Sequence, residues 1–443
     1  MDNLKKKILI CIHNPFALVN LQPIIEEIKS DYEITIFTSN YFLNNQSIHK
    51  KVLEIKKNSQ IKNFFIIPSY KSNSEKRSFF SIIKSHYFLY KFKSFFKKKK
   101  FNLCISDGSF FIWQKIILTN FLEKNCIRIG LTHDSLNLHL DEFQKFLNGK
   151  KIDDILRDVH KLRQIKKNNN KFRKKKFFLR IVNTIKRIED LYIDRQIIPL
   201  ILYGKKFIYM KNDLKTAFDT NSFKYIINFF YSSFRFWGKY YGEENTFLVK
   251  PKNNCGCNIK KKKNKILFIS SFLWNEESNS LDFEIDHFFK FIEKTISEHK
   301  EILEIDFRHH PMQSDKDIKF FNEYLIKKNK KEYNINFEHK YDPISKITCE
   351  YKLIFGCSSS ALYFAKHGCY NAEIVCLKSL SVNELGEKYY YKLWNEGIIM
   401  YDDINNSFDN LDNLPSKEYL TFKQSIEKIE KIDKHKNLIY KKI

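Results

Sequence analysis

The stretch Tyr351–Gly368, YKLIFGCSSSALYFAKHG, decides the fold of this chain. Its first part is apolar and as short as a buried strand, and it stops at Gly356, where a cysteine and three consecutive serines lead into a helical pattern. A buried strand that passes directly into a helix is typical of a parallel sheet in an α/β domain. Such sheets bind ligands at the carboxyl ends of their strands, and hydroxyls at a helix start suit a phosphate. The stretch therefore predicts an anion site at Ser358, Ser359 and Ser360.

A second strand pattern lies upstream, in EILEIDFRHHP, residues 301–311. It alternates apolar and polar residues and ends on two histidines and Pro311. Because side chains alternate along a strand, we expect His309 and His310 to point to opposite faces. We assign His310 to the ligand, where an imidazole can bind or protonate a departing phosphate oxygen. Ser271, at the end of the strand pattern that begins at Lys265, is a further candidate, and together these residues predict a nucleotide-sugar site.

The rest of the chain alternates strand and helix patterns in two units, which predicts parallel sheets with right-handed crossovers. We expect an amino-terminal Rossmann-like domain over residues 1–250, with a charged helical insertion at about 141–202. A low-hydrophobicity linker, Lys250–Asn264, precedes a second Rossmann-like domain over 265–415. Residues 416–443 read as a charged helix that returns to the first domain. The predicted fold class is α/β of the GT-B type, two such domains with a cleft between them.

The chain has a net charge of +27, from 78 basic and 51 acidic residues. Its basic residues cluster at Lys76–Lys100 and Lys161–Arg187, and neither segment contains Asp or Glu. Basic helices with an aromatic-rich apolar face are typical of proteins that lie on an anionic membrane surface, although a charged face packed on its own domain gives the same pattern. No recognised nucleic-acid module accompanies the charge, so we expect no nucleic-acid partner.

No apolar run is long enough to span a membrane, and the apolar stretch near the amino terminus is too brief for a signal peptide. We therefore expect a cytoplasmic protein that is peripherally associated with the inner face of the membrane. The nine cysteines fit this compartment, because five of them lie in or beside apolar strand patterns as small buried residues, and no Cys/His spacing predicts a zinc site.

The pair His310–Pro311, followed by the serine run, resembles the motifs of bacterial GT-B glycosyltransferases of the sialyltransferase type. It is more distantly similar to polysaccharide Kdo transferases and CDP-glycerol glycerophosphotransferases. The resemblance covers about residues 265–380 and, loosely, the first 135. It implies that the histidine contacts the phosphate of a cytidine nucleotide and assists its departure, while the hydroxyls bind the same phosphate. The donor it implies is a CMP-linked sugar, with no other cofactor.

These families carry a third motif, an acidic pair followed by glycine, that supplies the general base. The nearest match is Ser106–Asp107–Gly108, which has serine at the first acidic position. The resemblance implies Asp107 as the base, although Ser-Asp-Gly is also a good turn sequence. His133, at the tip of the next strand pattern, is the second candidate, because a histidine near this place serves as base in the glycerophosphotransferases.

We thus expect an inverting glycosyltransferase that transfers a sugar, such as sialic acid or Kdo, to a lipopolysaccharide, capsule or other lipid-linked glycan. No Asp-x-Asp pair follows a strand where metal-dependent glycosyltransferases place one, so we predict a metal-independent reaction. A CDP-glycerol-type glycerophosphotransferase and a nucleotide-sugar 2-epimerase are the alternatives. A non-catalytic basic scaffold is a further one, and it predicts no nucleotide affinity.

Overall fold

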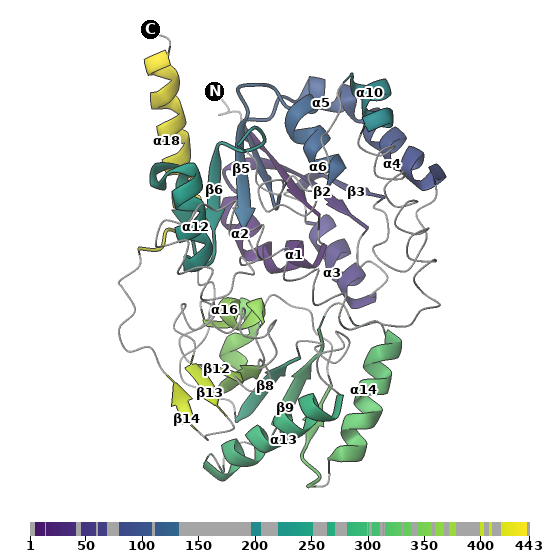
Figure 1. Cartoon of the computed structure of the whole chain (residues 1–443), viewed down its shortest axis with the longest axis vertical. Coiled ribbons are helices and arrows are strands. Elements are labelled where there is room, and N and C mark those ends of the chain that lie inside the picture. Colours follow the sequence, from purple (N-terminus) through teal and green to yellow (C-terminus); the bar gives the residue numbers. More distant parts are fainter. Residues whose placement is uncertain are drawn as a thin grey trace, which may run out of the picture.

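The structure is a computed structural model. It describes residues 5–13, 15–40, 46–58, 61–68, 79–108, 111–132, 196–204, 220–250, 264–270, 281–298, 300, 304–310, 313, 315–329, 331–337, 344–356, 359–366, 372–377, 399–402, 407–409 and 418–440. Two sheets dominate it, one above the other in Figure 1.

The first sheet has seven strands in the order β3-β2-β1-β4-β5-β6-β7, all parallel. Its strands are β1 Lys6–Ile12, β2 Tyr32–Ser39, β3 Ile61–Ile67, β4 Leu103–Ser106, β5 Ile127–Thr132, β6 Tyr225–Asn228 and β7 Thr246–Leu248. The central strands are apolar and buried along most of their length, as expected of a parallel sheet that is covered on both faces.

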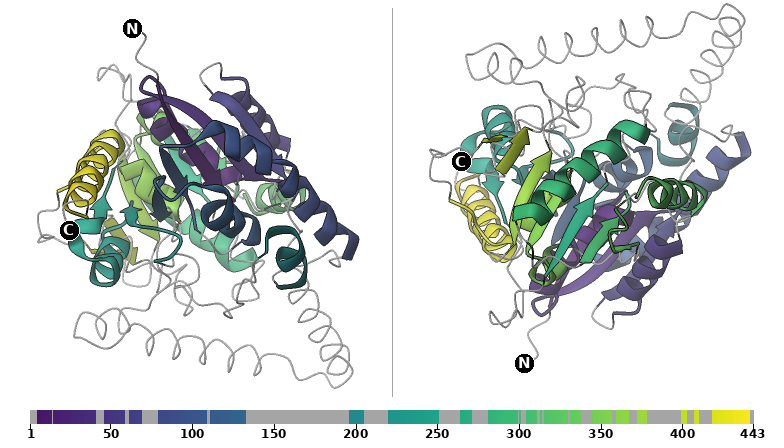
Figure 2. Two further views of the ribbon diagram at one scale, coloured as in Figure 1. Left: turned by 90° about the horizontal axis from the view of Figure 1, so that it is seen from above. Right: turned by 90° about the horizontal axis from the view of Figure 1, so that it is seen from below.

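Helices cover both faces of this sheet. One face packs against α1 (Pro15–Asn20), α2 (Gln22–Ile28), α3 (Gln46–Lys56) and α18 (Phe422–Tyr440). The other packs against α4 (Phe79–Lys91), α5 (Lys93–Lys99), α6 (Ile112–Ile116) with the π-helical turn Ile117–Phe121, and α12 (Tyr231–Tyr241). In Figure 2, α18 lies at one side of this domain and α4 at the other.

The second sheet also has seven strands, in the order β10-β9-β8-β11-β12-β13-β14, and only β14 runs antiparallel. Its strands are β8 Lys265–Ile269, β9 Glu304–Arg308, β10 Ile335–Asn336, β11 Leu353–Gly356, β12 Glu373–Leu377, β13 Ile399–Asp402 and β14 Ser407–Asp409. One face packs against α13 (Leu281–Glu298) and α14 (Asp315–Lys328), the other against α15 (Ile344–Ile347) and α16 (Ser360–Lys366). The predicted fold class, two Rossmann-like α/β domains of the GT-B type, is confirmed.

The two domains meet at the carboxyl ends of their strands. Phe229 and Phe230, directly after β6, contact α16, the helix that follows β11: ring centroids lie 5.6 Å apart for Phe229 and Phe364 and 4.2 Å apart for Phe230 and Tyr363. The Tyr363 hydroxyl donates to the carbonyl of Val249, after β7, at 3.4 Å. The carboxyl-terminal edges of both sheets therefore face each other.

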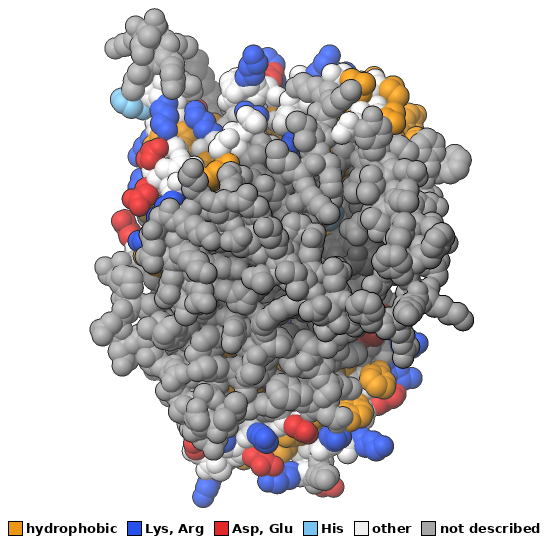
Figure 3. All heavy atoms as spheres, viewed as in Figure 1, with side chains coloured by type: hydrophobic (Ala, Val, Ile, Leu, Met, Phe, Trp, Pro, Cys, Tyr) orange, Lys and Arg blue, Asp and Glu red, His pale blue; other side chains and the backbone are white. Residues whose placement is uncertain are grey.

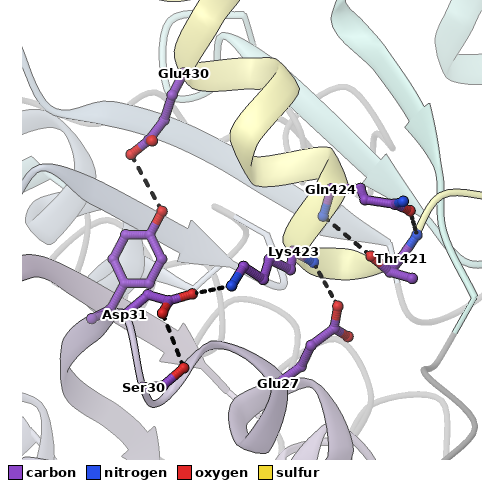
Figure 4. Close-up of polar contacts among 8 residues, drawn as sticks. Glu27, Ser30, Asp31, Thr421, Lys423, Gln424 and Glu430 are labelled. Carbon is purple, nitrogen blue, oxygen red and sulfur yellow. Dashed lines mark hydrogen bonds and ion pairs between the residues drawn. The ribbon is translucent and has the colours of Figure 1, made fainter.

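The last described helix, α18, lies against the first domain (Figure 4). The ammonium group of Lys423 pairs with Asp31 at 2.6 Å, and its backbone N–H donates to Glu27 at 3.0 Å. Further along the helix, Glu430 accepts a hydrogen bond from Tyr32 at 3.4 Å. Just before α18, Leu420 pairs with the chain at the end of β7, which covers the edge of the sheet.

Several predicted elements differ from those observed. The helical pattern in the sequence over residues 18–30 is divided between two helices, because Pro23 lacks a backbone donor and instead stands in the first turn of α2. Strand β6 and helix α12 had no counterpart in the sequence prediction. The predicted helical insertion lies outside the described residues, apart from residues 196–202, and so does all of Lys161–Arg187.

In the segment Lys76–Lys100, four phenylalanines fit the alternative of a charged face packed on its own domain. Phe88, Phe92, Phe95 and Phe96 pack into the core of the first domain around Phe37, and none belongs to its exposed apolar surface. They lie along α4 and α5, with Phe92 between the two helices. The basic residues on the outer face are left exposed, so the segment is a structural helix pair as well as a charged surface.

Candidate functional site

Each sheet has one position where the strand order reverses, between β1 and β4 in the first domain and between β8 and β11 in the second. On either side of such a switch point the connections run in opposite directions, which leaves a crevice at the carboxyl ends of the strands for a ligand. The predicted base Asp107 follows β4, and the predicted serine run follows β11. Both candidate regions therefore stand at a switch point.

In the first domain, Asp107 joins the ends of the two switch-point strands. Its two carboxylate oxygens both accept the backbone N–H of His13, which follows β1, at 3.0 Å. Its own backbone N–H donates to the Cys11 carbonyl at 3.3 Å. The side-chain amide of Gln114, on α6, also donates to the carboxylate. Asp107 is thus fixed in one orientation while remaining partly exposed.

His13 is a site residue that the sequence analysis missed. Its ring is buried, stacks on Phe111, and accepts a hydrogen bond at Nδ1 from the indole N–H of Trp113 at 3.3 Å. Burial lowers the pKa of His13 to about 3, so the ring is neutral near pH 7. A neutral imidazole that accepts at Nδ1 carries its proton on Nε2, which makes it a hydrogen-bond donor.

In the second domain, β8 and β11 approach unusually closely at the switch point. A Cβ atom on Gly356 would lie 2.5 Å from the carbonyl oxygen of Ile269, a distance that no side chain tolerates. Gly356 therefore permits this pairing. The Ser359 hydroxyl accepts the backbone N–H of Ala361 at 3.2 Å, and Ser360 is the first residue of α16.

The neighbouring strand β9 delivers His310 to the same edge. His309 is buried in a ring cluster, 4.9 Å from Phe307 between centroids, and its Nε2 lies 2.7 Å from the side-chain oxygen of Asn322. His310 is only partly buried, and its backbone N–H and carbonyl are both hydrogen-bonded to Gln313. The surroundings of the two histidines therefore differ, and their opposite orientation stays a prediction.

Arg308, the last residue of β9, is a second residue that the sequence analysis missed. It is buried, and by strand alternation it shares a face of β9 with Asp306, which accepts a hydrogen bond from Tyr351 at 2.8 Å. In the sequence, Arg308 continues the polar positions Glu304 and Asp306 of the strand pattern, so its charge was visible but its burial was not. A buried guanidinium at the ligand-binding edge is suited to an anionic group.

Four of the predicted site residues, namely His133, Ser271, Pro311 and Ser358, lie outside the described residues. Of the others, Asp107 stands at the first switch point, and Ser359 and Ser360 stand at the second. His310 lies one strand away from the second switch point.

A cavity of about 820 Å³ lies at the opposite edge of the first sheet, where the strands begin. It is lined by residues such as Lys6, Phe101 and Ile127 and by the charged side of α18. Its charges are of both signs, and Lys6 forms an ion pair with Glu430 across it. Since parallel α/β sheets bind ligands at the other edge, we do not assign the site to this cavity.

No family model and no curated protein matches the chain. Among solved structures, an α/β-galactoside α-2,3-sialyltransferase from Photobacterium phosphoreum is 11% identical, with a TM-score of 0.44 over 88% of this chain and 96% of that one. UDP-GlcNAc 2-epimerase from Methanocaldococcus jannaschii is 13% identical, with a TM-score of 0.41 over 84% and 83% of the two chains. MurG of Acinetobacter baumannii is 8% identical, with a TM-score of 0.35 over 87% and 82%.

Proposed function

We propose that the chain is an inverting, metal-independent glycosyltransferase that transfers a sugar from a nucleotide donor to a glycan or glycolipid acceptor. The observation that carries this proposal is the pair of switch points on facing sheet edges. One presents a fixed carboxylate and a neutral imidazole, and the other a close strand pair, a hydroxyl-rich helix start and a nearby histidine. The first set suits an acceptor hydroxyl, and the second suits a phosphate.

On the acceptor side, Asp107 takes the proton of the attacking hydroxyl, with His133 as the second candidate. The hydroxyl oxygen forms a bond to the anomeric carbon from the face opposite the phosphate, so the configuration inverts. Gln114 and the His13 backbone N–H hold the carboxylate in place, which supports a base that must lie within hydrogen-bond reach of its substrate. The neutral His13 ring donates a hydrogen bond to a sugar oxygen in this arrangement.

On the donor side, the bond from the anomeric carbon to the phosphate oxygen breaks, and its electron pair stays on the nucleotide. His310 and Pro311, the run Ser358–Ser360, and Ser271 contact the phosphate, and Arg308 adds a buried positive charge. Oriented donors and a cation at the point where negative charge develops lower the barrier to departure.

The donor base is cytidine in this proposal, which follows from the motif resemblance, and the sugar is an acidic one such as sialic acid or Kdo. The acceptor belongs to a surface polysaccharide that is assembled at the inner face of the membrane. A CDP-glycerol-type glycerophosphotransferase and a nucleotide-sugar 2-epimerase are the alternatives, and the experiment below separates the epimerase from the proposed function.

The test is a thermal-shift panel with CMP, CDP, UDP and GDP on the wild type and on His310→Ala. A ligand bound to the native state raises the midpoint, so CMP or CDP should stabilise the wild type and should stabilise the variant less. Stabilisation by UDP or GDP alone would change the base assignment, and no shift with any nucleotide would contradict the nucleotide site. Turnover of a nucleotide sugar without acceptor would instead identify an epimerase.

A further inference from the structure

An exposed apolar surface lies on the first domain, away from the switch point. It is formed by Ile83, Tyr87 and Tyr90 on α4 and by Ile197, Leu200 and Ile201 at helix α10, Ile198–Tyr203. Ile201 is 74% exposed and Tyr87 57% exposed, the largest values among the exposed large hydrophobic side chains of this domain. Figure 3 shows hydrophobic side chains gathered at the end of the molecule where Figure 1 places α4 and α10. We call these six residues the α4–α10 patch.

The patch is a built surface, because α10 is fixed on α4. The Tyr203 hydroxyl donates to the His86 carbonyl at 3.1 Å, and its ring lies 6.2 Å from that of Tyr90 and 5.8 Å from that of Phe121. Ile198 and Pro199 are buried underneath. Because the inner face of α10 is packed in this way, Leu200 and Ile201 on its other face are exposed. Each fully buried aliphatic side chain is worth about 1.5–3 kcal/mol, so this exposure favours a partner.

The charge around the patch indicates which partner. Lys84 and Lys91 are exposed on α4, and Lys93 is exposed at the start of α5. The ammonium group of Lys91 lies 4.5 Å from the ring centroid of Tyr87, and that of Lys93 lies 5.6 Å from the ring centroid of Tyr90. The lysine side chains lie along the apolar surface and place their charges at its rim. This arrangement suits a bilayer, in which anionic headgroups lie above the acyl chains.

The aliphatic members of the patch distinguish a membrane from a nucleic acid. Bases stack on aromatic rings, and Ile83, Leu200 and Ile201 offer none. Aliphatic side chains at the outermost positions, with tyrosines beside them, are instead the composition of a membrane-interface anchor.

We propose that the α4–α10 patch docks the first domain on an anionic lipid bilayer. This proposal rests on the proposed function for its biological sense. It deepens that function, because an enzyme on the bilayer surface lies where a lipid-linked acceptor can reach it. Ile201, Leu200 and Tyr87 insert among the acyl chains, and Lys84, Lys91 and Lys93 meet the phosphate headgroups. The segment Lys161–Arg187, which carried half of the sequence-based expectation, is not needed for it. None of the described helices is long and apolar enough to cross a membrane.

The test is co-sedimentation of the full chain with phosphatidylcholine vesicles that contain or lack phosphatidylglycerol, at low and high salt. Ile201→Ser should weaken binding to the anionic vesicles by about tenfold, the loss of one inserted aliphatic side chain. The matched control is Ile326→Ser on α14, a residue that is 61% exposed on the second domain. This control should change vesicle binding less than about twofold, since the substitution of an exposed residue outside the binding surface has a small effect.

A second variant separates charge from insertion. Lys84→Ala/Lys91→Ala should weaken the preference for anionic vesicles, while the wild type should keep part of its binding at high salt because the apolar insertion is not screened. The proposal is overturned if the wild type ignores anionic vesicles at low salt, or if Ile201→Ser and Ile326→Ser bind equally. It is also overturned if a single-stranded oligonucleotide, but no vesicle, is bound through the patch.

The nucleotide panel on the same variants keeps the two proposals apart. Ile201→Ser should retain the wild-type thermal shift with nucleotide. Vesicle binding without a thermal shift by nucleotide would contradict the proposed function and support membrane docking by the α4–α10 patch. A thermal shift by nucleotide without vesicle binding would support the proposed function and contradict the docking.

Discussion

The two switch points are built by opposite means. In the first domain, side chains hold one another: Asp107 is hydrogen-bonded to Gln114 and to the His13 backbone, and the His13 ring is held by Trp113 and Phe111. In the second domain, the arrangement depends on backbone proximity, with Gly356 against Ile269 and Ser359 at the start of a helix. The difference fits the two tasks proposed for these sites, since a base needs one fixed side chain, whereas a phosphate needs several oriented donors.

The largest effect is expected at His310. His310→Ala should lower turnover by about a hundredfold or more, because it removes a group that stabilises the departing phosphate. The neighbouring His309→Ala should act differently: it removes a ring packed between Phe307 and Phe321, so the melting temperature should fall. Near-normal turnover in His310→Ala would remove the phosphate role from this residue.

The fixed carboxylate of the first switch point gives the next prediction. Asp107→Asn preserves the shape but removes the proton acceptor, so turnover should fall by about a hundredfold while nucleotide affinity changes little. Gln114→Ala keeps the carboxylate and loosens its orientation, and it should cost about tenfold. Steady-state kinetics beside nucleotide titration would check both. An unchanged rate in Asp107→Asn with a large loss in His133→Ala would assign the base to His133.

The close strand pair of the second switch point is tested by stability. Gly356→Ala forces a Cβ against the Ile269 carbonyl and should lower the free energy of unfolding by about 1–3 kcal/mol. Gly238→Ala is the matched control: Gly238 lies within helix α12, where an added Cβ would meet only Glu243 at 3.7 Å. This change should be neutral or stabilise by about 0.5–1 kcal/mol. Urea denaturation of both variants compares them, and equal losses would contradict the tight approach.

The buried ring of His13 predicts a smaller, pH-dependent effect. The unfolded chain binds a proton at the ordinary pKa of 6.5, whereas the folded chain resists protonation down to about pH 3. Stability therefore falls as the pH drops below 6.5, by at most about 1.4 kcal/mol per pH unit. His13→Gln removes this titration, so the difference in unfolding free energy between wild type and variant should narrow at acidic pH. If the unfolding free energies of the wild type and His13→Gln changed in parallel with pH, His13 would not be buried as a neutral ring.

The sequence predicted those parts of the fold that depend on local pattern. Strands such as β1 and β12 are short apolar runs, and their order along the chain with helices between them predicts parallel sheets. Strand β6 was missed because Tyr225–Asn228 is short and is followed by aromatic residues with no turn signal. The break between α1 and α2 was missed because helical periodicity continues through Leu21 and Pro23.

The candidate site divides in the same way. Asp107, His310 and the serine run follow strand patterns, so their place at the sheet edge is readable from the sequence. The importance of His13 depends on a partner ring about a hundred residues away, Trp113, which no local pattern reveals. Gly356 was visible only as a strand end, and its close contact depends on the register between β8 and β11.

The return of α18 has a consequence for how the chain is made. Phe422, Ile426 and Ile429 are buried in the core of the first domain, and Leu420 completes the edge of its sheet. These residues emerge from the ribosome only after the whole second domain has been synthesised. The first domain must therefore wait, with part of its apolar surface uncovered, while the second domain folds beside it. A fragment that ends at the linker should expose this surface and aggregate, and adding the α18 peptide in trans should rescue it.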